Sequence, residues 1–154
     1  MTELGELVSG DLDEWLDVLP GYQRARLQSM LVTRDPLEVA TAWLDASGPM
    51  DTAPFGATKS TGERFFDNLL NEMKKLFCGD ATYESELKEL LSAGNGTKMF
   101  LVAGISTVLA PHVGAAAAVI APAVTLVLAV AGKAGAATAC GSLTDIIEAR
   151  SSTS

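Results

Sequence analysis

Three side chains in this 154-residue chain could support reactive or switchable chemistry: its only histidine, His112, and its two cysteines, Cys78 and Cys140. Protonation of His112 near pH ~6 would place a charge between two apolar segments, although a histidine exposed in a hairpin loop is the simpler interpretation. The cysteines lack CxxC spacing, so we expect small core residues, with a disulfide between them as the alternative. One histidine and two distant cysteines predict no metal site and no cofactor.

Enzyme signatures are otherwise weak. Residues 56–60 and 94–98 faintly resemble a phosphate loop, but neither has the GxxxxGK[ST] spacing or a preceding strand. The formal net charge is −8 and there is no basic stripe, which argues against nucleic-acid binding. We therefore expect a protein that is not an enzyme and does not bind nucleic acid.

The chain is organised around an apolar block, residues 99–139, that is rich in Ala, Val and Gly and has only two residues able to carry charge. Pro111 lacks a backbone N–H and its ring clashes with the preceding turn, so a single helix is not expected. The pattern predicts a hairpin of two apolar helices, at about 98–110 and 113–132. The first is too short to cross the ~30 Å hydrocarbon core of a bilayer.

The second apolar helix has the length of a transmembrane segment but not its usual composition. Ala and Gly dominate it, and Pro122 interrupts its middle. Lys98 and Lys133 bracket the block as interfacial anchors would. Residues of the block that we expect to contact a partner or a membrane are Lys98, His112, Val124, Leu126, Leu128 and Lys133.

The remainder of the chain predicts short amphipathic helices. Residues 1–48 form an acidic unit of three helices, with Asp35 and Pro36 as a strong start signal for the third. Residues 49–59 form a linker or loop. Its single large aromatic residue, Phe55, is either a partner anchor or a contact that fastens the loop.

A capping box at Ser60 and Glu63 starts the helix with the clearest apolar stripe in the chain. A stripe of this width needs an equally apolar surface, which the 99–139 hairpin supplies. The helical region extends over residues 60–150, and residues 151–154 form a polar tail. The expected fold is all-α: a bundle of short amphipathic helices packed around an apolar C-terminal helical hairpin.

Two functions fit this architecture. The first is a non-enzymatic interaction or adaptor subunit, which assembles with itself or with a protein partner and has the hairpin as its core. The second is a membrane-active effector, pore-forming or membrane-anchored, that inserts residues 99–132. In architecture alone the arrangement is similar to pore-forming bacteriocin domains, in which such a hairpin stays buried until it meets a membrane. The acidic N-terminus lacks the pattern of a secretory signal, so we expect a cytoplasmic protein, membrane-associated in the second case.

Overall fold

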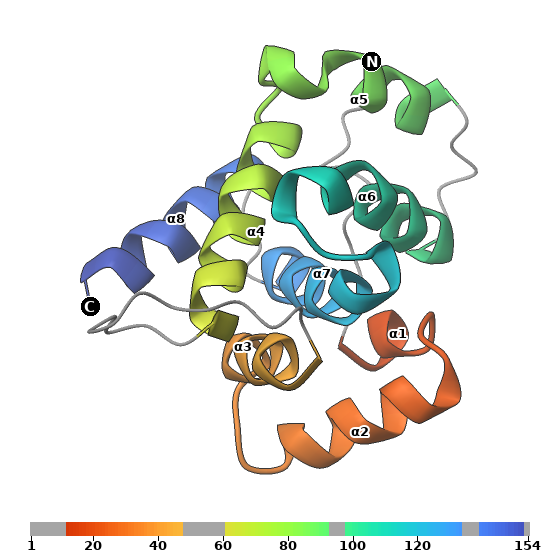
Figure 1. The fold of residues 1–154 in the computed structure, drawn as a ribbon, viewed down its shortest axis with the longest axis vertical. Helices are drawn as coiled ribbons and strands as arrows, with labels where there is room; N and C mark the ends of the chain where they lie inside the picture. The colour runs from red at the N-terminus through yellow and green to blue at the C-terminus, as the bar shows by residue number, and fades with distance from the viewer. Residues whose placement is uncertain (1–11, 48–60, 93–97, 134–138, 153–154) are drawn as a thin grey trace.

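The computed structural model describes residues 12–47, 61–92, 98–133 and 139–152. Over these ranges the fold is all-α, as the sequence predicts (Figure 1). The α-helices are α1 (Leu12–Leu16), α2 (Gly21–Leu31), α3 (Pro36–Ser47), α4 (Thr61–Phe77), α5 (Glu84–Ser92), α6 (Lys98–Val113), α7 (Ala117–Lys133) and α8 (Ala139–Ser152), with a 3-10 helix, η2 (Ala81–Tyr83), before α5.

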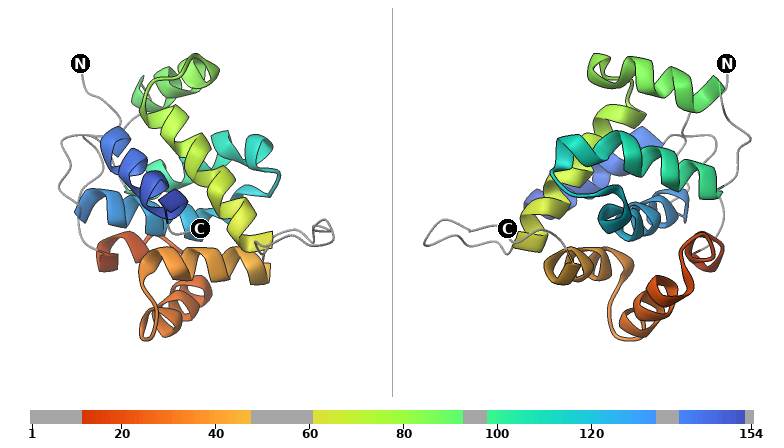
Figure 2. Two further views of the ribbon diagram at one scale, coloured as in Figure 1. Left: turned by 90° about the vertical axis from the view of Figure 1, so that its left-hand side faces the viewer. Right: turned by 45° about the vertical axis from the view of Figure 1, so that its right-hand side comes forward.

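Helix α7 lies at the centre of the molecule, packed against α1 and α3 on one side and against α6 and α8 on others (Figures 1 and 2). All its residues from Pro122 to Ala129 are buried. A helix that is apolar on every face must be surrounded by other apolar surface, and here the amphipathic helices provide it. The sequence prediction of an apolar core surrounded by short helices is therefore confirmed.

Pro122 does not interrupt α7, which continues from Ala117 to Lys133. A proline at this position leaves the carbonyl of Ala118, four residues earlier, without its helical donor. The side-chain amide of Gln23 on α2 donates to that oxygen at 3.5 Å, and the next carbonyl, of Val119, accepts from the indole N–H of Trp43 on α3 at 2.8 Å. The N-terminal helices thus supply donors where the proline removes one.

Pro111 does not end α6 either, which corrects the predicted boundary at residue 110. The proline falls in the last turn of a helix that extends to Val113. The chain then leaves the helix at Gly114, which has a φ of +88°, and its N–H donates to the carbonyl of Ala110 at 2.9 Å. A positive φ at low cost requires glycine, so Gly114 rather than Pro111 sets the break between α6 and α7.

Helix α4 connects the N-terminal helices to the rest of the core, because it packs against α3, α6 and α8. Its crossing with α3 is close at Gly62, where a Cβ atom would lie 2.5 Å from the carbonyl oxygen of Thr41. The N–H of Gly62 donates to a carboxylate oxygen of Asp45 at 2.6 Å. The predicted cap of α3 is also present, with the N–H of Glu38 donating to Asp35 at 2.9 Å.

Candidate functional site

The large aliphatic residues proposed for membrane or partner contact lie inside the protein. Val124 and Leu126 have no exposed surface and Leu128 is 1% exposed. All three are on α7 and belong to one hydrophobic cluster with residues of α1, α3, α4, α6 and α8. In this structure they contact neither solvent nor any surface a partner reaches, so such a role would require α7 to leave its surroundings.

The charged candidates at the ends of the apolar block have different positions. Lys98, the first residue of α6, lies 3.3 Å from a carboxylate oxygen of Glu14 and 5.3 Å from the ring centre of Trp15. It therefore fastens α6 to α1 instead of standing free. The side chain of Lys133 and the whole of Phe55 lie outside the described residues.

His112 lies in the last turn of α6 beside a buried carboxylate. Its Nδ1 is 4.0 Å from an oxygen of Glu72, and its ring meets that of Tyr83 edge to face, with centroids 4.9 Å apart. The imidazole is 40% exposed. The structure thus brings together one residue each from α4, η2 and α6, a grouping that their spacing in the sequence does not reveal.

Glu72 is the centre of this polar group. It is only 7% exposed, accepts from the hydroxyl of Tyr83 at 2.5 Å and accepts from the ammonium of Lys75 at 3.0 Å. Burial by itself would raise the pKa of the Glu72 carboxyl, but the hydrogen bonds from Tyr83 and Lys75 outweigh it and lower that pKa. Burial, together with the hydrogen bond to ionised Glu72, raises the pKa of the Tyr83 hydroxyl well above its ordinary value. The group holds η2 and the end of α6 against α4.

The two cysteines form a disulfide, with Cα atoms 5.0 Å apart, which corrects the expectation of two separate core residues. Cys78 follows the last residue of α4 and is exposed, and Cys140 is the second residue of α8. Cys78 lines an open surface groove of roughly 610 Å³ together with Asn68, Asn71, Glu72, Lys74, Lys75, Gly79 and Asp80. The bond joins the end of α4 to the start of α8.

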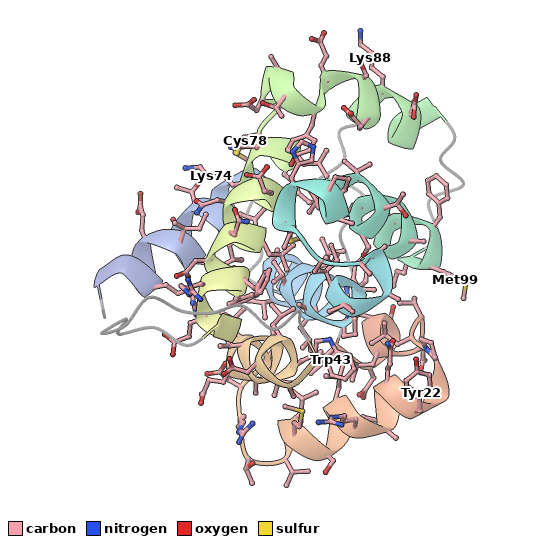
Figure 3. The ribbon with its side chains drawn as sticks, viewed as in Figure 1. Tyr22, Trp43, Lys74, Cys78, Lys88 and Met99 are labelled. Atoms are coloured by element: carbon pink, nitrogen blue, oxygen red, sulfur yellow. A yellow bond between two sulfur atoms is a disulfide. The ribbon has the colours of Figure 1, made fainter. Side chains whose placement is uncertain are left out.

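Two large hydrophobic residues are exposed on α2 or directly after it. Tyr22 is 74% exposed and Val32 is 82% exposed, and in the described chain only Met99, at 62%, joins them as a large exposed hydrophobic residue. Tyr22, Arg26, Ser29 and Val32 recur at helical spacing and are all exposed. We call these four residues the α2 stripe. Figure 3 shows Tyr22 and Met99 directed away from the core.

None of these groups of described residues has the arrangement of a metal site. Within the described ranges there is no group of three His, Cys, Asp or Glu residues able to hold a metal ion. Among the described helices, none alone has the length and apolar composition to cross a membrane, whereas α6 and α7 as far as Ala131 meet that criterion together, with a bend of 116° between them. No protein-family model, curated protein or solved structure matches the chain.

Proposed function

We propose that this protein is a non-enzymatic helical interaction module that assembles with further copies of itself through the α2 stripe. The observation that carries the proposal is the exposure of Tyr22, 74%, on α2 and of Val32, 82%, directly after its last residue. Helix α2 itself buries only Gln23 and Leu27. Large apolar side chains at the edge of a folded core favour association, because contact removes their surface from water.

Charge favours a second copy as the partner. The segment 21–34 contains three arginines and no acidic residue, although the whole chain has a formal net charge of −8. The segment 80–92, which includes η2 and α5, contains four acidic residues and one lysine. Helices α2 and α5 lie at opposite ends of the longest axis of the molecule (Figures 1 and 2). Docking of α2 on α5 of the next copy therefore joins opposite charges in a head-to-tail arrangement, which builds a ring or a filament according to the rotation between copies.

The test is sedimentation velocity of the full chain over a wide range of protein concentration and at low and high salt. We expect concentration-dependent association that weakens at high salt, because the opposed charges are at the surface. Val32→Glu should reduce the association. Met99→Glu is the matched control, because Met99 is a similarly exposed apolar residue on another helix.

A charge exchange tests the orientation. Arg34→Glu should weaken association by itself, and mixing it with a Glu84→Arg variant should restore the mixed complex, since the exchanged charges meet again across the interface. Wild-type protein that stays monomeric at every concentration would contradict self-assembly. Equal effects of Val32→Glu and Met99→Glu would contradict the role of the α2 stripe.

A second candidate function is membrane insertion of the α6–α7 hairpin, favoured by one observation. These two helices together are apolar enough for a bent span, and Lys98 stands at the start of the pair. Insertion would separate Lys98 from Glu14 and remove α7 from α3. Fractionation of cells followed by a carbonate wash of the membrane pellet distinguishes the two functions. Protein that remains in the washed pellet supports insertion, and protein found only in the soluble fraction supports the interaction module.

A further inference from the structure

The disulfide between Cys78 and Cys140 is accessible on the Cys78 side. Cys78 is exposed and lines the open groove that also contains Lys74 and Lys75, residues of the last turn of α4. Figure 3 labels Cys78 and Lys74 at this end of α4. Exchange with a thiol requires the attacking sulfur to reach a disulfide sulfur in line, which a buried bond prevents. The groove also contains Glu72 and Asp80, and the ammonium of Lys75 is paired with Glu72, so the ammonium of Lys74 is the one placed to attract a negatively charged thiolate.

The other sulfur belongs to a residue suited to leave as a thiolate. Cys140 is the second residue of α8, a helix of 14 residues, and the N-terminus of a helix stabilises negative charge. Thiols at this position have lowered pKa values, and a thiol of lower pKa leaves faster in exchange. The groove and the helix terminus therefore predict the same reaction: attack on the sulfur of Cys78, with Cys140 as the leaving group.

We propose that the Cys78–Cys140 disulfide is a thiol-exchange site for small anionic thiols. The thiolate of the incoming molecule attacks the sulfur of Cys78, forming a mixed disulfide there while the bond to Cys140 breaks and Cys140 leaves as a thiolate. A second thiolate attacks the sulfur of the attached small molecule, giving the small-molecule disulfide and a Cys78 thiolate. Two small thiols are oxidised to one disulfide as the protein gains two electrons.

Exchange opens a covalent loop that contains the whole apolar block, residues 99–139. The two cysteines are 62 residues apart, and η2, α5, α6 and α7 all lie between them. After exchange α8 is still joined to α4 by the ion pair of Arg150 with Asp67, at 2.7 Å. Exchange thus removes the covalent constraint on the segment that contains α7, while the far end of α8 stays in contact with α4.

The experiment treats the native, oxidised full chain with glutathione, an anionic thiol, and separately with cysteamine, a cationic one. Acid quenching, alkylation of free thiols and peptide mass mapping then locate the products. We expect glutathione on Cys78 with alkylated Cys140 at early times. Lys74→Glu should slow the glutathione reaction about threefold without slowing the cysteamine reaction, because one charge near the groove reverses sign. Lys88→Glu, on an exposed residue that does not line the groove, is the matched control.

Each of three results would overturn the proposal: glutathione attached to Cys140 first, exchange only after the protein is unfolded, or the same rate change for Lys74→Glu and Lys88→Glu. A measurement on the wild-type protein keeps the proposal testable even if a variant misfolds. In wild-type protein the glutathione rate should fall as salt rises while the cysteamine rate should not. Equal salt dependence for the two thiols contradicts recognition by Lys74.

Discussion

Replacing both cysteines, as Cys78→Ser with Cys140→Ser, tests the largest single constraint on the fold. In the chain-entropy description, a cross-link stabilises a protein by restricting its unfolded state, and the effect grows with the logarithm of the loop length. The 62-residue separation corresponds to about 4 kcal/mol at room temperature. Cys78 is exposed, so its replacement leaves no cavity there and the loss should come mainly from the unfolded state.

The assay is equilibrium unfolding in urea, followed by far-ultraviolet circular dichroism, for the oxidised wild type and for the double variant. We expect a lower free energy of unfolding in the variant and a larger dependence on urea, because the unlinked unfolded chain exposes more surface. A loss of about 4 kcal/mol corresponds to a fall of roughly 8–16 °C in Tm for a domain of this size. Wild-type protein unfolded in the presence of a reductant should behave like the variant.

A difference below about 1 kcal/mol between the oxidised wild type and the variant would refute this reasoning, because it lies far below the loop-entropy value. Alkylation of both cysteines in the native, untreated protein would refute it directly. The single variants are less informative, since each leaves one free thiol able to link two chains.

Two further predictions concern the polar contacts of the core. Trp43→Phe removes the donor to the Val119 carbonyl while keeping an aromatic ring. We expect a loss of about 1–2 kcal/mol in the free energy of unfolding, measured in urea. An unchanged free energy of unfolding would contradict the hydrogen bond. The pKa of Glu72 lies below its ordinary 4.5, so its stabilising contribution is complete above about pH 4.5 and disappears as pH falls through the folded-state pKa. The wild type should therefore lose more stability than Glu72→Gln when Tm is measured on acidification below that pH, and parallel losses would contradict the ionised pair.

The parts of the fold predictable from sequence are those set by neighbouring residues. Asp35 and Pro36 mark the start of α3 because a cap needs only residues within one turn. The stripe that begins at Phe65 and Phe66 marks α4 because an amphipathic helix records its buried face in its own spacing. The apolar composition of residues 99–139 predicts a core, which α7 forms, whereas α6 exposes Met99, Ala103 and Thr107 on one face.

The disulfide and the polar group around Glu72 could not be predicted in this way, because each depends on contacts between distant segments. The disulfide joins residues 62 positions apart, and the donors that accommodate Pro122 come from α2 and α3. The general rule for proline assumes that the helix ends before the proline, so it predicts the end of α6 at residue 110 although the helix continues to Val113. The contacts of His112 with Glu72 and Tyr83 could not be predicted either, since these two residues lie on other elements, distant in the sequence. The α2 stripe had a weak signal, an arginine-containing helix in an acidic chain.

The central position of α7 has a consequence for synthesis of the protein. This helix begins at residue 117, so α1, α3 and α6 are synthesised before the surface they pack against. Trp15 on α1 and Val39 on α3 are fully buried in the finished fold, and their helices gain this packing surface only after α7 has been synthesised. Domains whose core closes late expose apolar faces during translation, and such intermediates aggregate unless chaperones bind them. The order of the helices along the chain thus predicts a nascent protein that depends on chaperones until its last third has been made.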